Sequence, residues 1–519
     1  KTVDPNGNIT TYGYDLAGNR ISETDANGNT TTYEYNAKGQ VIKTKDALGN
    51  VTVFAYGGSG CASCGGGTDK LTALTDANGA FTAYQYDTLG RLLKEIDPLD
   101  NETGYTYDLK GNPVTRTDAN GATITYSYDG NGRLLKKSYP DGTEETFSYD
   151  VKGNILTAAN RNISYTFSYD PAGRMLSSAD SNGRTVSYVY DTAGRKTKLT
   201  YPDGFSANYA YDATGRLSRL TTADGQAYVF SYDSLGRRTR LNYPNGTSAT
   251  YGYDSTGKLL TLTHKGALGT TIDSFIYTHD KVGNRLTKKQ PLFTTAYTYD
   301  AVYRLTRAKP SLPLESTEQY GYDAVGNRLS GPKAQQTYQY NQGNQLTEET
   351  ARPANFLTEL FGPNAAPTGK ARYDYDKNGN LIKKTETTIL PDKPLTTLYI
   401  YDFENRLTRV EIRFGPAVVT TTFSYDPLGR RIGKKTTGTA GPLNGTDTRT
   451  YLYDGPNILL EYRDTDILGA DFTGTTRYLH GPGIDEPLSL TRNGATWYYH
   501  SDGLGSIVAL SNNHGIVAE

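Results

Sequence analysis

The sequence is poor in sulfur and in tryptophan. Its 519 residues include 2 cysteines, 1 methionine and 1 tryptophan. The two cysteines, Cys61 and Cys64, supply two thiolates, whereas a structural zinc site needs four ligands. The sequence also has no Gly-x-Ser-x-Gly elbow, phosphate-binding loop or His-Glu-x-x-His helix. These gaps predict a protein that is not an enzyme and that needs no cofactor or metal.

Net charge and long apolar runs are missing as well. The chain has 54 lysines and arginines against 55 aspartates and glutamates, a formal charge of -1. Without a basic field, nucleic acid and anionic membranes are not expected as partners. No stretch approaches the roughly 18 apolar residues of a membrane span. The first residues read as the middle of a repeat, without a signal peptide, so we expect the natural protein to extend beyond both ends.

Tyrosine and glycine are abundant, with 44 and 56 residues, and they recur in an aromatic-x-Tyr-Asp-x-x-Gly-[Arg/Asn/Lys] phrase. In the most regular stretch the second tyrosine of the phrase stands at Tyr107, Tyr128, Tyr149, Tyr169, Tyr190, Tyr211, Tyr232 and Tyr253. Successive copies are therefore 20 or 21 residues apart. Such a fixed period predicts a repeat architecture, in which each unit buries its apolar face against its neighbours.

Each repeat is predicted to form one β-hairpin. In Thr-x-Tyr-x-Tyr both tyrosines lie on one face of a strand, because side chains alternate. Asp-x-x-Gly forms a turn, since Asp bonds its own backbone two residues on and Gly adopts positive φ easily. A return strand follows, and a different turn, Asp-Ala-Asn-Gly or Tyr-Pro-[Asp/Asn]-Gly, closes the unit. No segment keeps a helical period, so the predicted fold class is all-β, a repeat of antiparallel hairpins.

The residues of the phrase are predicted to be structural. The clearest copies contain Tyr14, Asp15, Gly18, Tyr86, Asp87, Gly90, Arg91, Tyr190, Asp191, Gly194, Arg195, Tyr211, Asp212, Gly215 and Arg216. Because both tyrosines of every unit face one way, we expect a continuous aromatic ladder, with cross-strand pairs worth about 0.2 to 1 kcal/mol each. The rival interpretation is that stacked rings on an exposed face bind sugars.

A row of this many hairpins cannot remain one flat sheet. Roughly forty strands at about 4.8 Å each would extend on the order of 190 Å. Strands twist with a fixed hand, and open sheets of more than about ten strands curl or split. The sheet is therefore expected to coil and pair with itself. The sequence leaves open whether it forms a spiral shell around a lumen or a narrow filled solenoid.

The Tyr-Asp phrase, its Gly-Arg continuation and the 21-residue period closely resemble the YD-repeat or RHS family. This family includes bacterial RHS toxins, the shell subunits of Tc toxins and the extracellular part of teneurins. The resemblance covers most of the chain. It implies a hollow spiral β-shell, which in the toxins encloses an inactive C-terminal effector. Asp426-Pro427-Leu-Gly429 superficially resembles the self-cleavage segment of some members, but it lies inside an ordinary repeat and is interpreted as a turn.

Three regions are predicted along the chain. They are regular YD repeats at 1–345 with a Gly/Cys-rich insertion at 57–68, irregular repeats with insertions at 346–476, and a stretch at 477–519 that resembles the end of RHS cores before the core-associated segment. Insertions in repeat proteins form loops on one face, often the face that meets partners. The candidate loops are Ala351 to Pro363, Leu390 to Pro394 and Gly433 to Thr448.

Three stretches could carry chemistry, and each has a simpler structural explanation. Cys61 and Cys64 are predicted to form a local disulfide or an inert loop, in preference to a metal or redox site. The Asp-x-Asn-Gly turns, and the more acidic stretch from Asp97 to Glu102, are explained by turn chemistry without calcium. His500 and Asp502 could suggest an acid–base pair, but a turn follows directly and catalysis is not expected.

The leading hypothesis is a non-enzymatic shell of a secreted or surface-delivered bacterial RHS protein that encloses or carries a C-terminal toxin or effector. Its partners would be that effector domain of the same polypeptide, or another copy or shell component. The alternative is a cell-surface adhesion or matrix protein, whose repeats act as a spacer or bind carbohydrate. An enzyme of carbohydrate or redox metabolism ranks last, because only the two cysteines favour it.

Overall fold

Every regular element that the structure describes is a β-strand. The structure, a computed structural model, describes residues 1–57, 69–312, 316–332, 336–350, 367–388, 394–439, 444–467, 470–483 and 485–518. These residues contain no helix, and therefore none long and apolar enough to cross a membrane. The predicted all-β class is confirmed.

The first part of the chain consists of short strands. They are β1 (Thr2–Val3), β2 (Ile9–Tyr14), β3 (Arg20–Thr24), β4 (Thr30–Tyr35), β5 (Val41–Lys45), β6 (Val51–Tyr56), β7 (Leu71–Thr75), β8 (Phe81–Tyr86), β9 (Leu92–Ile96), β10 (Glu102–Tyr107), β11 (Pro113–Thr117), β12 (Thr123–Tyr128), β13 (Leu134–Ser138), β14 (Glu144–Tyr149), β15 (Ile155–Ala159), β16 (Ser164–Tyr169), β17 (Met175–Asp180), β18 (Thr185–Tyr190), β19 (Lys196–Thr200), β20 (Ser206–Tyr211), β21 (Leu217–Thr222), β22 (Ala227–Tyr232), β23 (Arg238–Asn242) and β24 (Ser248–Tyr253).

The second part has strands of more varied length. They are β25 (Leu259–Lys265), β26 (Thr271–His279), β27 (Arg285–Lys289), β28 (Thr294–Tyr299), β29 (Leu305–Pro310), β30 (Glu318–Gln319), β31 (Gly321–Tyr322), β32 (Arg328–Ser330), β33 (Tyr338–Tyr340), β34 (Leu346–Glu349), β35 (Pro367–Tyr375), β36 (Leu381–Thr388), β37 (Leu395–Tyr401), β38 (Leu407–Phe414), β39 (Ala417–Tyr425), β40 (Arg431–Gly438), β41 (Gly445–Asp454), β42 (Asn457–Ile467), β43 (Ala470–His480), β44 (Pro487–Arg492), β45 (Ala495–Ser501) and β46 (Ile507–Ser511). Strands β42 and β43 reach 11 residues each, so the later hairpins are longer than the early ones.

Strands pair antiparallel with the next one along the chain, except between β30 and β31 and between β32 and β33, which gives the predicted row of hairpins. The pairing forms a 30-stranded sheet, a 2-stranded sheet and a 14-stranded sheet. Within a repeat the register shifts just before the second tyrosine of the phrase, as between Gln85 and Tyr86 or between Thr106 and Tyr107. A β-bulge of this kind increases the local twist, so its recurrence in unit after unit favours a coiled strip over a flat one.

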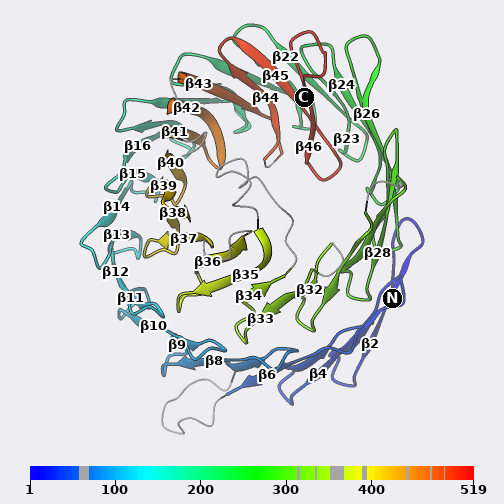
Figure 1. Cartoon of the computed structure of the whole chain (residues 1–519), viewed down its shortest axis with the longest axis vertical. Coiled ribbons are helices and arrows are strands. Elements are labelled where there is room, and N and C mark those ends of the chain that lie inside the picture. The colour runs from blue at the N-terminus through cyan, green and yellow to red at the C-terminus, as the bar shows by residue number, and fades with distance from the viewer. Residues whose placement is uncertain are drawn as a thin grey trace.

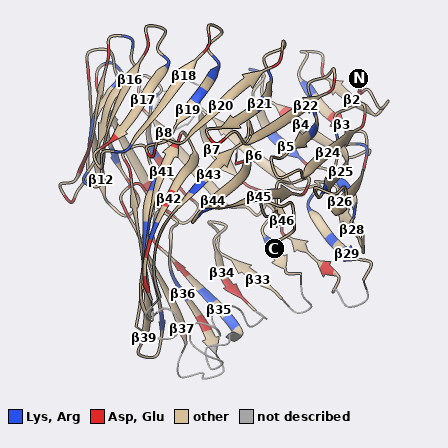
Figure 2. Ribbon diagram, turned by 90° about the horizontal axis from the view of Figure 1, so that it is seen from above, with Lys and Arg blue, Asp and Glu red and all other residues tan. Residues whose placement is uncertain are grey.

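The strip coils into an open spiral of two rounds (Figure 1). The first round, β1 to β24, follows the outside of the view, and the second round, β25 to β46, continues along it and turns in toward the middle. Figure 2 shows basic and acidic residues interspersed along both rounds, in keeping with the balanced composition. The predicted coiling of hairpins is thus observed.

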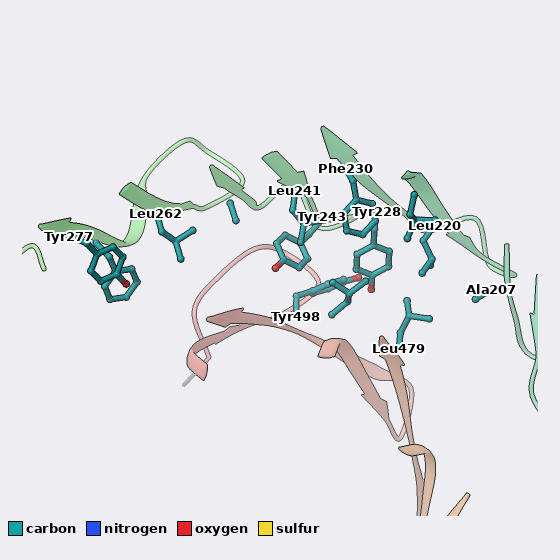
Figure 3. Close-up of a cluster of buried hydrophobic side chains, with 14 residues drawn as sticks. Ala207, Leu220, Tyr228, Phe230, Leu241, Tyr243, Leu262, Tyr277, Leu479 and Tyr498 are labelled. Atoms are coloured by element: carbon teal, nitrogen blue, oxygen red, sulfur yellow. The ribbon is translucent and has the colours of Figure 1, made fainter. Parts of the chain in front are cut away.

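The buried core lies between the two rounds. Its largest cluster joins side chains of β20 to β26 with side chains of β43 to β45 (Figure 3). Tyr228 and Phe230 of β22 lie in this cluster together with Leu479 and Tyr498 of the second round. Tyr228 and Phe230 therefore lie on the face of the strip that meets the second round.

The position of this core predicts where stability is lost. Leu220 is fully buried in the cluster, whereas Leu292 is 85% exposed. Leu220→Ala should destabilise the fold by about 2–5 kcal/mol, because it removes buried methyl groups and leaves a cavity. Scanning calorimetry should show a lower melting temperature for Leu220→Ala and no such change for the control, Leu292→Ala. Equal melting temperatures would contradict a core between the rounds.

Candidate functional site

The aspartate of the phrase closes its own turn. In the unit at Asp87, Oδ1 accepts hydrogen bonds from the backbone N–H groups of Leu89 at 2.9 Å and Arg91 at 2.8 Å. Oδ2 accepts the Arg91 Nε–H at 2.6 Å, and Gly90 has a φ of 77°. The hydrogen bonds from Arg91 hold the pKa of Asp87 below its ordinary value. The carboxylate therefore fixes both the backbone of the turn and the arginine that follows it.

The arginine and the tyrosine then clamp one repeat to the next. The guanidinium of Arg91 lies 4.8 Å from the ring centroid of Tyr107, and its NH1 group donates to the Asp108 carbonyl at 3.0 Å. In return, the Tyr107 hydroxyl donates to the Leu92 carbonyl at 2.7 Å. The same clamp recurs at Arg133 with Tyr149, Arg174 with Tyr190, Arg216 with Tyr232, Arg237 with Tyr253 and Arg304 with Tyr322.

All the predicted signature residues except Tyr14 lie in these turns and clamps. The hydroxyls of Tyr86, Tyr190 and Tyr211 donate to the backbone of the preceding repeat at 2.7 to 2.9 Å, whereas Tyr14 is 59% exposed. The carboxylates of Asp15, Asp87, Asp191 and Asp212 hold Asn19, Arg91, Arg195 and Arg216, and Gly18, Gly90, Gly194 and Gly215 have positive φ. That these residues are structural and bind no ligand stays a prediction.

A seam between the two rounds is the feature that sequence reasoning missed. We call the Tyr-Asp turns the YD turns, and the turns that end each unit at the other edge of the strip the closing turns. Closing turns of the first round meet YD turns of the second. In four cases an asparagine Nδ2 of a closing turn donates to an aspartate Oδ2 of a YD turn: Asn6 to Asp254 at 2.8 Å, Asn27 to Asp280 at 2.9 Å, Asn78 to Asp323 at 2.8 Å and Asn120 to Asp376 at 3.0 Å.

These aspartates have two tasks. Asp254, for example, closes its own turn with Oδ1 and accepts the Asn6 amide with Oδ2. Although partial burial raises the pKa of Asp254, hydrogen bonds from Thr256 and Asn6 lower it to about 2. The carboxylate is therefore ionised near neutral pH, as an acceptor of several hydrogen bonds must be.

Further along, the seam is made by tyrosines. In the Tyr-Pro-[Asp/Asn]-Gly closing turns, the Tyr201 hydroxyl donates to the Tyr478 carbonyl and the Tyr243 hydroxyl to the Tyr499 carbonyl, both at 2.9 Å. Tyr139 stacks on Phe403, with ring centroids 6.1 Å apart. The two kinds of closing turn thus make two kinds of contact, a polar one and an aromatic one. In the sequence, the aromatic part of the seam is marked by tyrosine in place of aspartate at the first position of the closing turn.

His500 and Asp502, two residues apart in the sequence, have different partners. His500 Nδ1 lies 3.3 Å from His264 Nδ1, and its Nε2 lies 2.9 Å from the Ser511 hydroxyl. Asp502 instead accepts a hydrogen bond from Lys288 Nζ at 2.9 Å. Burial, followed by the neighbouring His264, lowers the pKa of His500 to about 3. The geometry describes two buried, neutral imidazoles at the seam and no coupled acid and base.

The other residues that could carry chemistry are the two cysteines and the acidic stretch from Asp97 to Glu102. Cys61 and Cys64 lie outside the described residues, as does the loop from Ala351 to Pro363. Among the described residues no group of three or more His, Cys, Asp or Glu side chains is placed to hold a metal ion. In the acidic stretch, Asp97 Oδ1 accepts the backbone N–H groups of Leu99 and Asn101, as in the other turns.

A pocket with a volume of about 900 Å³ lies between the rounds. Its wall includes the rings of Tyr209, Tyr211, Tyr232, Tyr251 and Tyr253. The charged groups at its rim are paired: Lys196 Nζ lies 2.8 Å from Asp454, and Arg238 pairs with Glu486. The pocket therefore presents aromatic faces and neutralised charges, which suit contact with apolar or hydroxylated groups.

Comparison with known proteins identifies the family models and the relatives that the chain matches. The teneurin YD-shell family model matches residues 68–202, 114–286 and 275–518, and the RHS repeat model matches 1–30 and 17–51. The double-stranded DNA deaminase toxin A of Burkholderia cenocepacia is 28% identical over 258 residues, which are 47% of this chain and 16% of that protein. The probable deoxyribonuclease RhsB of Dickeya dadantii is 29% identical over 185 residues, 34% of this chain and 12% of that protein.

Solved structures share the fold at low identity. The crystal structure of TcdB2-TccC3 without its hypervariable C-terminal region gives a TM-score of 0.64 at 17% identity, over 98% of this chain and 31% of that one. A Tc holotoxin pore of Photorhabdus luminescens gives a TM-score of 0.58 at 17% identity, over 98% of this chain and 31% of that one. The chain thus spans less than a third of these proteins and less than a fifth of the curated relatives.

The aromatic half of the seam can be tested at Tyr243. Tyr243→Phe keeps the ring but removes the hydroxyl that donates to Tyr499, at a cost of about 1 kcal/mol. Hydrogen–deuterium exchange should therefore be faster in β45 than in the unchanged protein. The same substitution at exposed Tyr14 serves as the control and should leave β45 unaffected. Unchanged protection of β45 in Tyr243→Phe would mean that this hydrogen bond does not hold the seam.

The histidine pair predicts a pH dependence. Burial lowers the pKa of both His264 and His500 from the ordinary 6.5, so the folded state disfavours their charged forms. The neutral imidazoles therefore contribute fully to the stability of the fold above pH 6.5. This stability is lost progressively as the pH falls below 6.5, down to about pH 3 for His500. Between pH 7 and pH 5 this amounts to roughly 2 kcal/mol for His500.

Exchange of β45 and β46, corrected for intrinsic rates, should therefore accelerate between pH 7 and pH 5. A double variant, His264→Gln with His500→Gln, should lose most of this dependence. His514→Gln, at an exposed position, should retain it. A pH dependence that survives in the double variant would assign the effect to other groups.

Proposed function

The chain belongs to the teneurin YD-shell family, and from this premise we propose that it forms the wall of a shell that encloses a C-terminal toxin or effector of the same polypeptide. The wall itself is non-enzymatic in this proposal. Its task is confinement, in which a folded barrier keeps an effector from meeting its substrate until delivery. We further propose that the protein is secreted or delivered at the cell surface.

The observation that carries the proposal is the continuity of the wall. The clamp between Arg91 and Tyr107 and its counterparts join neighbouring hairpins, and β1 to β30 form one continuous sheet, as do β33 to β46. The seam then joins one round to the other, from Asn6 with Asp254 to Tyr243 with Tyr499. Barrier function needs such continuity in both directions, and it needs no reactive side chain.

The relatives support a carried effector. The matched proteins include one named a double-stranded DNA deaminase toxin and one named a probable deoxyribonuclease, and the chain aligns with 16% and 12% of their lengths. Proteins named for such different activities match the same kind of repeat. A shared carrier with variable cargo accounts for this pattern.

A second candidate function is carbohydrate binding by a surface protein. The pocket that contains Tyr209, Tyr232 and Tyr251 favours it, because aromatic faces and hydroxyls suit a saccharide. Glycan-array binding that is lost in Tyr251→Ala would support this function. Binding to no glycan would leave confinement as the better account.

Limited proteolysis of the native full-length protein tests confinement. The C-terminal segment should resist protease as long as the wall is intact. Tyr201→Ala combined with Tyr243→Ala removes two seam contacts and should expose that segment to cleavage, while the control, Tyr14→Ala, should not. Rapid cleavage of the C-terminal segment in the unchanged protein would overturn the proposal.

A further inference from the structure

The four asparagines that donate to aspartates across the seam all precede a glycine. They stand in the sequences Asn6-Gly7, Asn27-Gly28, Asn78-Gly79 and Asn120-Gly121. The closing turn needs glycine there, because these four glycines have φ values of 81° to 91°. All four asparagines are exposed, so water reaches them. We call them the seam asparagines.

An asparagine that precedes glycine can lose its side-chain amide spontaneously. The backbone nitrogen of the glycine attacks the side-chain carbonyl carbon, Cγ, an approach that the missing Cβ of glycine leaves open. The N–Cγ bond forms, the Cγ–Nδ2 bond breaks, and ammonia leaves with the proton of the backbone amide, which gives a cyclic imide. Water then opens the imide to aspartate or isoaspartate. Water is the only co-reactant, and nothing is oxidised or reduced.

The closed seam directs the side-chain amide away from this reaction. Asn78 Nδ2 is held on Asp323 Oδ2 at 2.8 Å, and Asn27 Nδ2 is held on Asp280 Oδ2 at 2.9 Å. The attack requires the side chain to leave the aspartate and to turn its Cγ toward the glycine nitrogen. A hydrogen bond to a carboxylate must therefore break first, which slows the reaction while the rounds are in contact.

Asn182 provides a matched comparison within the same chain. Its closing turn, Asp180 to Gly183, has the backbone hydrogen bonds of the turn from Asp76 to Gly79. In both turns the aspartate Oδ1 accepts the asparagine N–H, at 3.0 and 2.9 Å, and the aspartate carbonyl accepts the glycine N–H at 3.0 Å. Among the residues that the structure describes, however, the side-chain amide of Asn182 donates to none. The two turns therefore differ in whether the seam holds the asparagine.

Deamidation turns such a contact from attractive to repulsive. Although burial raises the pKa of Asp323, hydrogen bonds from Asn78 and Asn327 lower it below its ordinary value, so this carboxylate is ionised near neutral pH. A carboxylate at position 78 would remove one donor and place a second negative charge beside the first. Where a closing turn carries aspartate naturally, at Asp203, the other round supplies a cation, Arg477.

We propose that the seam asparagines are deamidation sites, which the closed seam keeps unreacted and which, once the rounds have parted and they have reacted, prevent the rounds from closing again. In the aspartate product the turn itself can stay intact, because aspartate precedes glycine in the closing turn at Asp203 and Gly204. The effect then falls on the contact with the other round. The inference rests on the seam and does not require that the shell holds an effector.

Peptide mapping of the native full-length protein tests the protection. After incubation in mildly alkaline buffer, mass spectrometry should show that Asn27 and Asn78 have deamidated about 2- to 10-fold more slowly than Asn182, the factor that corresponds to one net hydrogen bond. In protein unfolded by urea the three positions should react at about the same rate, because all of them precede glycine. Asn27 and Asn78 reacting as fast as Asn182 in the folded protein would overturn the inference.

Variants that carry the product test its effect on the seam. Asn27→Asp combined with Asn78→Asp should accelerate hydrogen–deuterium exchange at neutral pH in the facing YD turns, from Asp280 to Asn284 and from Asp323 to Asn327. The control, Asn182→Asp, should leave exchange in those turns unchanged. Unchanged exchange in the double variant would show that the seam tolerates the product, and it would also overturn the inference. Both readouts are rates at named turns, so they are independent of protease protection of a C-terminal segment.

Discussion

The carboxylate of the repeated Tyr-Asp turn is the group on which the rest of the structure depends. One oxygen, as in Asp87, holds two backbone N–H groups of the turn, and the other holds the arginine that reaches the next repeat. Each such hydrogen bond contributes little, about 0.5 to 1.5 kcal/mol and more when a charge is involved. Repetition makes the sum large. Because many neighbouring hairpins are fixed to each other in the same way, the strip keeps curving in one direction and coils into a spiral.

The spiral adds a second requirement, that the two edges of the strip fit each other one round apart. The polar part of the seam meets it with asparagine amides on aspartate, as at Asn78 and Asp323, and the aromatic part with tyrosines such as Tyr243. The buried core also joins the two rounds, because Tyr228 of the first round and Leu479 of the second lie in the same cluster. The later hairpins of the first round are therefore stabilised by contacts with the second round. The earlier hairpins, such as the one around Tyr14, are stabilised mostly by hydrogen bonds within their own turns.

The hairpins could be predicted from the sequence because everything that determines them is local. Alternation in strands, the aspartate that bonds its own turn and the glycine at positive φ all act within a few residues. The seam could not be predicted in this way, since its partners are about 245 to 277 residues apart and nothing in the sequence of one repeat indicates its position in the spiral. His500 shows the same limit. Its sequence neighbour Asp502 pairs with Lys288, and its actual partner, His264, belongs to a strand far upstream.

The central claim is that these hairpins form the continuous wall of a shell around a carried effector. A cryo-electron-microscopy reconstruction of the native full-length protein tests it most directly. We expect a spiral wall, with closing turns seated on YD turns at every round, around a lumen that contains weak density for the effector. A lumen filled by side chains of the wall, or an extended ribbon whose rounds do not touch, would rule out a shell that confines an effector.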